Sequence, residues 1–561
     1  MAAALSFPGI YIQELPLSTH TITPTPTSIA AFVGYTHPWK TAAFNTAVQI
    51  FSFTDYQNNF GGLYTSGLIP SDVAQAVSVF FLNGGNNAWV VGIQPQAYAG
   101  NSAKAQFGSA ADDLCFVAAL NPDPAQPTIG MQFQGLEPCD IVSMTATISN
   151  LRTNPQNSAS PNSYTLFDLV ITYGSKIEGY RGIDITIAQG QPNSLDKLIN
   201  GISTLVTVQP ISGTSYGTQF PVAAGATLPV PPAPATFTIA TIETPPAAPT
   251  PGLPAGFTGS FNANDFLPAF QANSSLDNVE IFNLLLVPGV SDNVVLSAAL
   301  AFAERKRAFA ILDPPPQATA FKIPGSSLPT IDALGPDGAS PVIPQSQNGA
   351  LYFPYLLSTD PVSGLPIAIA PSGYVAGIYA TTDTTRGVWK APAGIGTPLL
   401  STTGPVVTGL MNDPQQGVLN LDSINCIRSF AATGTVVFGA RTLVAKNQAF
   451  AQSKYVPVRR MTLFIEQTLL ANLKWVVFEP NDEPLWLAIK SSIEAFLLSL
   501  FNQQALQGSQ PSQAFQVKVD STTTTPQDQQ NGIVNIVVGV ALLKPAEFVV
   551  IKISQLAGQT S

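Results

Sequence analysis

Residues 213–217 read Gly-Thr-Ser-Tyr-Gly and fit the G-x-S-x-G pattern, which places Ser215 where many hydrolases hold a nucleophile. That chemistry needs a strand before the serine, a helix after it and a histidine later in the chain. The loop here is rich in Ser, Gly and Thr, and the two histidines, His20 and His37, both precede it. The order of the residues therefore argues against this hydrolase arrangement and favours a plain loop.

A second candidate for chemistry is the carboxylate cluster of residues 479–483, in a chain of which only 10% of residues are charged. Three acids so close together could bind a metal ion or transfer protons. They also suit a helix start, because Asn481 or Asp482 can accept hydrogen bonds from free backbone N–H groups. Glu483 would then place a negative charge at the positive end of the helix. We favour the helix-capping interpretation, with an interface salt bridge to Arg459 or Arg460 as an alternative.

Residues suited to metal or redox chemistry are sparse. The cysteines, Cys115, Cys139 and Cys426, are odd in number and widely spaced, so they predict no disulfide framework. Together with the two histidines they offer no ligand pair at a usable spacing. No phosphate-binding or dinucleotide-binding glycine loop opens a helix. We therefore expect no metal, no cofactor and no enzymatic activity.

Composition narrows the class of protein. The chain has 561 residues, 45% of them hydrophobic, which favours several domains with their own cores. With 23 basic and 33 acidic residues and no basic run, it lacks the means to neutralise nucleic-acid phosphates. We see no signal peptide, and the longest apolar candidate, 532–543, is shorter than the ~20 residues that span a bilayer. We expect assembly in the cytoplasm and no stable membrane insertion.

Periodicity predicts mixed α/β elements at both ends of the chain. Residues 101–275 differ: they carry long neutral, Pro-rich stretches and predict one or two inserted β-rich domains. The predicted strands are 28–35, 47–53, 88–93, 474–479, 514–520 and 532–543, with further strands on either side of a helix that begins at Ser291. The other predicted helices begin at Ser71 or cover 458–473 and 482–502.

Two short segments near the ends of the chain have one apolar face each. Residues 7–15 are followed by a Thr/Pro-rich tether that cannot form a helix, and residues 547–555 lie close to the C-terminus. The apolar faces would be formed by Ile10 and Ile12, which alternate with Tyr11, and by Val549, Ile551 and Ile553. All six are candidate residues of the inter-subunit strand arms. Because a lone strand cannot satisfy its backbone groups, we expect both segments to pair with exposed sheet edges.

Several co-linear blocks resemble the tail sheath proteins of contractile phage tails and related injection particles. The resemblance covers about 1–95 and 350–561. Its blocks are PGIYIQE, SIAAFVGYT, TTRGVWKAPAG, LNLDSINCIRSF, GTVVFGARTL, KYVPVRRMTLFIEQTL, KWVVFEPNDEPLW, NQQALQG, AFQVKVD and VGVALLKPAEFVVIKI. Cys426 and Phe438 stand where the family commonly has Pro and Trp, and both replacements are apolar.

The resemblance implies an α/β (α+β) sheath core built from the N- and C-terminal parts. The expected division is an N-terminal arm (1–27), core (28–100), β-rich insertion (101–275), an α/β segment that could be a second inserted domain (276–345), core (346–546) and a C-terminal arm (547–561).

The function that the resemblance implies is mechanical. Subunits would form a homo-oligomeric helical sheath around an inner tube, linked by donated terminal strands, and would contract to drive the tube through an envelope. Baseplate and terminal cap proteins are the other expected partners, and Lys490 on the helix 482–502 is a candidate tube contact. The particle could be a phage tail or a released or cell-anchored injection device. The alternative is a β-rich surface or adhesin-like protein without contraction.

Overall fold

The computed structural model describes most of the chain. The described residues are 20–37, 41–63, 72–93, 116–120, 131–135, 144–154, 164–173, 176–210, 213–217, 235–240, 261–315, 331, 335–336, 341–359, 366–406 and 411–553. The expected strand at 7–15, with Ile10, Tyr11 and Ile12, lies outside the described residues, as do Cys115 and Cys139.

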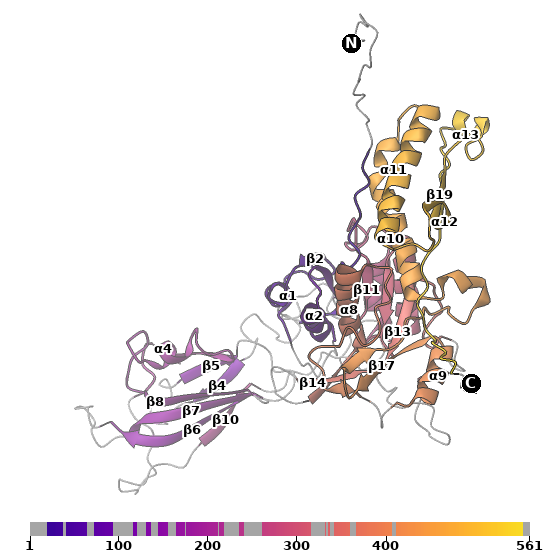
Figure 1. The fold of residues 1–561 in the computed structure, drawn as a ribbon. Coiled ribbons are helices and arrows are strands. Elements are labelled where there is room, and N and C mark those ends of the chain that lie inside the picture. The colour runs from indigo at the N-terminus through magenta and orange to yellow at the C-terminus, as the bar shows by residue number, and fades with distance from the viewer. Residues whose placement is uncertain are drawn as a thin grey trace, which may run out of the picture.

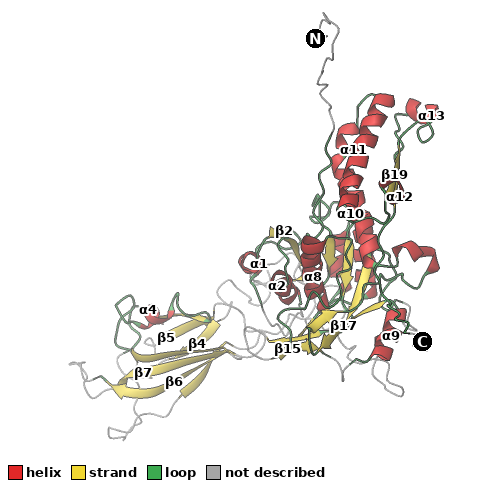
Figure 2. Cartoon of the chain, in the orientation of Figure 1, coloured by secondary structure: helices red, strands yellow, loops and turns green. Residues whose placement is uncertain are grey.

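An eight-stranded sheet forms the centre of the molecule, in the order β18-β17-β13-β12-β11-β1-β3-β2 (Figures 1 and 2). The strands are β1 (Ala30–Tyr35), β2 (Ala47–Ile50), β3 (Ala88–Ile93), β11 (Leu284–Leu286), β12 (Phe309–Leu312), β13 (Gly349–Phe353), β17 (Ile424–Phe430) and β18 (Gly434–Val437). Its inner strands pair in parallel, and the edge strands β2 and β18 are antiparallel to their neighbours.

Helices cover both faces of this sheet, which is why its inner strands are buried on both sides. In β1, Ala31 and Val33 pack into one core, with α6 (Asn293–Lys306), while Ala30 and Phe32 pack into the other. The second core contains α2 (Val73–Leu82) and α8 (Pro371–Arg386), which lie against each other.

Strands β4–β10 form a second body, on the left in Figure 1, with an apolar core of its own. Its two sheets have the orders β10-β6-β7-β8 and β4-β5-β9. The elements are β4 (Phe116–Leu120), β5 (Met131–Gly135), β6 (Met144–Thr153), β7 (Tyr164–Tyr173), β8 (Lys176–Asp184), α4 (Leu195–Ile199), β9 (Val206–Pro210) and β10 (Ala235–Ala240).

The chain returns to the central core earlier than the sequence predicts. Residues 261–275, expected in the β-rich insertion, contain α5 (Ala263–Phe266) and the 3₁₀ helix η2 (Leu267–Phe270), whose side chains pack beside β1 and α6. The segment 276–345 supplies β11 and β12, which lie inside the eight-stranded sheet. The described part of that segment therefore belongs to the core, and the idea of a second inserted domain is wrong for it.

A helical hairpin, α10 (Val456–Asn472) and α11 (Glu483–Asn502), projects from the sheet beside the two-stranded sheet of β19 (Phe515–Lys518) and β20 (Val537–Val540). These elements share a separate apolar core. By length and composition α11 could cross a membrane, but its apolar stripe, which includes Trp486, Ile489 and Ile493, is buried in this core. The longest apolar candidate in the sequence, 532–543, instead contributes β20.

The predicted strand 474–479 is wrong. Residues Lys474–Val476 form the 3₁₀ helix η4, and Phe478 is wholly exposed with a φ of 73°. The apolar run resembles a buried strand, but it connects two antiparallel helices and no other strand pairs with it among the described residues. Apolar content alone cannot distinguish these cases.

The remaining described elements complete the edges of the core. They are α1 (Phe53–Phe60), β14 (Leu356–Thr359), β15 (Pro366–Ile369), β16 (Gly404–Pro405), α9 (Asp413–Leu421), η3 (Gln448–Ser453), α12 (Pro511–Ala514) and α13 (Pro526–Gln530). Helix α1 was not predicted, and it takes over the last residue of the expected strand 47–53. The starts of α2 and α6 differ from the predicted starts by one residue, because Asp72 and Asp292, rather than Ser71 and Ser291, are the N-cap residues.

Asp313 is buried at the carboxyl end of β12, and the half-buried carboxyl group of Asp72 lies close to it. Asp313 accepts hydrogen bonds from the backbone N–H and hydroxyl of Ser372, both at 2.7 Å, and from Gly289 N at 3.0 Å. A side chain at Gly289 would collide with the carboxylate of Asp72. Burial raises the pKa of Asp313 to about 7, with a further contribution from the charge of Asp72. Burial also raises the pKa of Asp72 to about 6.

These raised pKa values predict that neutral pH destabilises the fold. An aspartate whose folded pKa exceeds its unfolded pKa binds more protons when folded, so the free energy of unfolding falls as pH rises through that interval. We expect an unfolding free energy ~1–3 kcal/mol higher near pH 5.5 than near pH 7.5, measured by urea denaturation. Asp72→Asn should remove part of this difference and raise stability near pH 7.5. Asp292→Asn, at another N-cap, is the control and should keep the full difference in unfolding free energy between the two pH values. An unchanged pH dependence in Asp72→Asn would contradict the raised pKa of Asp72.

Candidate assembly surfaces

The C-terminal segment is highly exposed. Residues 547–553 form neither helix nor strand, so the expected strand at 547–555 is absent from its described part. Val549 and Ile551 are each 79% exposed and Ile553 is 91% exposed. A strand needs a neighbouring edge, and no edge of the same chain pairs with this segment among the described residues. Its apolar side chains Val549, Ile551 and Ile553 therefore remain largely uncovered by the described part of the subunit.

Glu547, at the base of this segment, is firmly held. Its carboxylate accepts from Arg441 Nε at 2.8 Å and Nη2 at 2.9 Å, from Asn420 Nδ2 at 2.7 Å and from the Tyr455 hydroxyl at 2.9 Å. We call these four residues the Glu547 clamp. Burial alone would raise the pKa of Glu547, but the hydrogen bonds from Arg441, Asn420 and Tyr455 outweigh it and lower that pKa. Burial and the bond to Glu547 raise the pKa of Tyr455 to about 12.

The described part of the N-terminal tether, residues 20–29, lies along α10. Asn472 pairs with both backbone groups of Thr23, each at 2.9 Å, and Thr25 bonds to the Thr468 hydroxyl at 2.9 Å. The ring of His20 stacks on Trp475 with centroids 3.9 Å apart. This part of the tether is therefore docked on the body.

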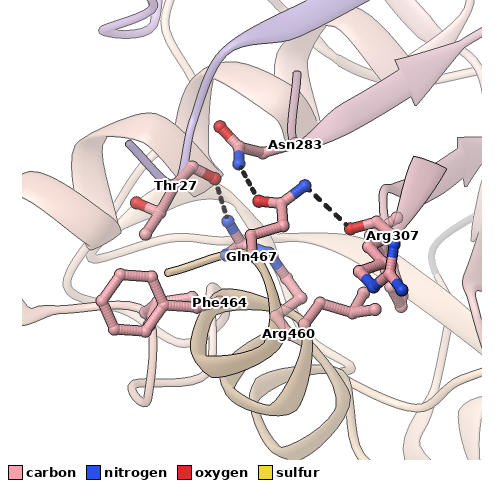
Figure 3. A pocket seen from close by; sticks show the side chains of 9 residues that line it. Thr27, Asn283, Arg307, Arg460, Phe464 and Gln467 are labelled. Carbon is pink, nitrogen blue, oxygen red and sulfur yellow. Dashed lines mark hydrogen bonds between the residues drawn. The ribbon is translucent and has the colours of Figure 1, made fainter. Parts of the chain in front are cut away.

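The inner end of the docked segment reaches a buried polar network (Figure 3). Arg460 donates to the Thr27 carbonyl at 2.9 Å and forms an ion pair with Asp383 on α8 at 2.6 Å. Both side chains of the pair are only 3% exposed. Next to it, Gln467 accepts from Asn283 at 2.8 Å and donates to the Arg307 carbonyl at 3.1 Å. The network joins α10 to α8, to the central sheet and to the N-terminal segment.

The carboxylate cluster at 479–483 lies at the start of α11. Asp482 is the N-cap residue and accepts from Glu483 N at 2.8 Å, and Glu483 lies in the first turn. Asn481 accepts from the indole N–H of Trp486 at 2.8 Å. Within the described part of the subunit these carboxylates form no salt bridge with Arg459 or Arg460, since Arg460 binds Asp383 and Arg459 lies 3.8 Å from Glu466.

The other sequence candidates for chemistry, Ser215 and Cys426, lie in different parts of the fold. Ser215 is exposed in a loop after β9, whereas Tyr216 is buried and donates to Asp196 at 3.0 Å. Cys426 is buried in β17, and burial raises its thiol pKa to about 12. Among the described residues, no group of three or more His, Cys, Asp or Glu side chains could hold a metal ion.

One face of α11 remains open to solvent. Lys490 lies on this face, 3.9 Å from Glu494 and 40% exposed, between the exposed Leu487 and Leu498. These positions recur at intervals of three and four residues, opposite the buried stripe.

The sheet of β19 and β20 offers backbone edges. In the part of the chain that the structure describes, it contains only these two strands. Two-stranded sheets are marginal by themselves and are stabilised by further strands or by a packed helix. Here α11 packs on β19, and among the described strands none pairs with the outer edge of β19 or β20.

Comparison with solved structures identifies this arrangement. A chain of the anti-feeding prophage helical sheath in its contracted state has a TM-score of 0.52 and 20% identity, covering 98% of this chain and 100% of that chain. A chain of the sheath complex of PVC, an extracellular contractile injection system, in its contracted state has a TM-score of 0.53 and 20% identity, covering 99% of both chains. The chain has the fold of contractile sheath proteins.

Sequence comparisons agree over a shorter region. A tail sheath protein of Vibrio phage KVP40 is 26% identical over 153 residues, which is 27% of this chain and 22% of that protein. The match thus spans about a fifth of the length of this curated relative. No family model matches the chain.

Sequence reasoning missed the Glu547 clamp. Arg441 and Glu547 each fall in a block that resembles sheath proteins, but 106 positions separate them. No periodic pattern pairs residues that far apart. The one available signal was that a glutamate directly precedes the apolar run of residues 548–551.

The docked N-terminal segment can be tested with Asn472→Ala. This change removes two hydrogen bonds that hold Thr23, each worth ~0.5–1.5 kcal/mol. We expect amide hydrogen exchange in residues 20–25 to become ~10-fold faster, while the cores exchange as before. Asn531→Ala, at an exposed helix end, is the matched control. Unchanged exchange in residues 20–25 would show that Asn472 does not hold the segment.

Proposed function

We propose that the chain is the sheath subunit of a contractile phage tail or injection particle. Copies polymerise helically around an inner tube, meet a baseplate and a terminal cap at the ends, and contract to drive the tube through a target envelope. The observation that carries this proposal is the match to contracted sheath chains over 98–99% of this chain. The region similar to a phage tail sheath protein supports it independently.

Subunits would be linked by strand donation. The row of exposed apolar residues at 548–553 has no partner sheet within the described chain, and β19 and β20 present unpaired edges. Burying Val549, Ile551 and Ile553 against a neighbour would contribute up to ~1.5–3 kcal/mol for each side chain. Ordering the segment costs ~1–2 kcal/mol per residue, so one arm is a modest link. Many arms in one lattice act together and hold the array.

Contraction would be a rigid-body rearrangement repeated along the polymer. The bodies rotate and slide while the donated strands stay paired, and no cofactor is needed because assembly stores the strain. The central sheet is buried between helices on both faces, which suits a body that moves as a unit. The β-rich body, with its own core, would be carried by this unit.

The β-rich body also supports an alternative function. An adhesin-like surface protein without contraction would use β4–β10 for recognition and would not form contractile tubes. Electron microscopy of the purified full chain separates the two proposals. Helical tubes of fixed diameter are expected of a sheath subunit, and monodisperse monomers at high concentration would favour the alternative.

Arm deletion tests strand donation directly. Removing residues 1–16 or 548–561 should abolish tube formation, because each deletion takes away an inter-subunit strand. The thermal transition of the body should stay in place, since the exposed C-terminal segment contributes little to the cores. Tubes are counted by electron microscopy and folding is followed by circular dichroism. Normal polymerisation of both truncated chains would rule out the arm mechanism.

Lys490 is proposed as a contact to the tube. Lys490→Glu should reduce the amount of sheath that co-sediments with purified inner tube by ~5-fold or more, because it reverses a charge on the open face of α11. Lys176→Glu, on the exposed strand β8 of the β-rich body, is the matched control. Equal co-sedimentation of the two variants would place the tube contact elsewhere.

A further inference from the structure

The Glu547 clamp joins the base of the C-terminal arm to α9, to the segment after β18 and to the start of α10. Asn420 belongs to α9, Arg441 lies between β18 and α10, and Tyr455 is the N-cap residue of α10. Two of the four contacts form a bidentate Arg–carboxylate pair, which has strict geometric requirements. The Arg441 side chain is 7% exposed and that of Glu547 is 19% exposed, so solvent screens the pair weakly.

The clamp continues into the central sheet through Arg441. Its backbone N–H donates to Asn425 Oδ1 at 2.7 Å, and its carbonyl accepts from Asn425 Nδ2 at 2.8 Å. Asn425 is fully buried in β17 and also donates to the Leu351 carbonyl of β13 at 3.1 Å. Arg441 Nη1 donates to the Asn420 carbonyl at 2.6 Å, which fixes the guanidinium from the other side. Hydrogen bonds thus connect Glu547 to two strands of the eight-stranded sheet.

We propose that Arg441 and Glu547 are positioning residues for assembly, which fix where residues 548–553 leave the body and transmit a neighbour's pull into the central sheet. This inference rests on the proposed function, because it assigns the clamp a role in strand donation. Residues 548–553 follow the clamp directly and are exposed, so the clamp is the last fixed point of the described chain.

The physical advantage is a shorter free segment. Upstream of Glu547, the nearest backbone pairing is the bridge between Leu506 and Leu542. Without the clamp, the free segment would start near residue 543 and gain about five residues. The end of a longer flexible tether explores a larger volume, which lowers its effective concentration at the acceptor edge. A pull on the arm would also act directly on the pairing at Leu542, which lies next to β20.

Acid should release the clamp. The pKa of Glu547 in the folded chain is lowered. The stability that its charged carboxylate contributes is therefore fully present above the ordinary pKa of a glutamate, and it is lost as the pH falls through the folded pKa. The protonated carboxyl keeps its shape but loses the charge that binds Arg441. This places the expected release below the pH range in which Asp72 and Asp313 titrate.

The test compares three full-length variants. Glu547→Gln keeps the size of the side chain and removes its charge, Tyr455→Phe removes one hydroxyl donor, and Lys446→Gln removes an exposed ion pair with Asp422 as the matched control. Two quantities are measured: amide exchange of peptides that cover 541–547 in the unassembled chain, and the critical concentration for tube formation.

We expect Glu547→Gln to speed exchange in 541–547 and to raise the critical concentration, each ~10-fold. Tyr455→Phe should act in the same direction by ~2–3-fold, and Lys446→Gln should match the wild type. Suppose that Glu547→Gln exchanges and assembles like the wild type while deletion of 548–561 still abolishes tubes. That result would contradict the assigned role of the clamp and leave the proposed function intact. Faster exchange with unchanged assembly would overturn its positioning role. If the wild-type chain forms no tubes, the proposed function itself fails.

Discussion

The buried ion pair between Arg460 and Asp383 is the constraint on which the arrangement of the body depends. Two charges this deeply buried are tolerated only when each satisfies the other, and loss of one partner typically costs ~3–5 kcal/mol. Arg460 also lies over the ring of Tyr379 at 4.5 Å and binds the Thr27 carbonyl. One side chain thus fixes α10 against α8 and sets where the N-terminal segment meets the body. The helical hairpin and the base of the N-terminal segment take their positions from this contact.

The local parts of the fold could be predicted from sequence. Helices α10 and α11 have periodic apolar positions, and strands β1 and β3 are short continuous apolar runs. Both signals depend only on near neighbours. The prediction failed at 474–479, where an apolar run joins two helices and Phe478 projects into solvent. Strand formation there would need a partner edge, which is a property of the tertiary structure. The starts of α2 and α6 were off by one residue because adjacent Ser and Asp side chains can both cap.

The sequence predicted that terminal segments take part in assembly, but it did not predict how they are held on the body. One-sided apolar segments near the chain ends indicated donated strands, and the exposure of Val549, Ile551 and Ile553 is compatible with that hypothesis. The anchor of the arm could not be found, because the pairing of Arg441 with Glu547 arises only after α9, β17 and the start of α10 have packed together. A single sequence carries no information on such distant pairs. It does contain the polar side chains that a docked tether requires, but their partners on α10 lie more than 400 positions away.

Helix α10 connects the bases of the two arms, and they are held in different ways. Its N-cap residue Tyr455 binds Glu547, whereas Asn472 in its last turn binds Thr23, ~25 Å away along the helix. The N-terminal segment is held mainly by neutral hydrogen bonds spread over several residues, each worth ~0.5–1.5 kcal/mol, which can open one after another. The C-terminal arm is held at one carboxylate by four bonds that open together. A pull would therefore lengthen the N-terminal tether gradually while the C-terminal arm keeps its length until the clamp fails. In a sheath whose subunits move during contraction, the N-terminal connection would therefore be the one that changes length.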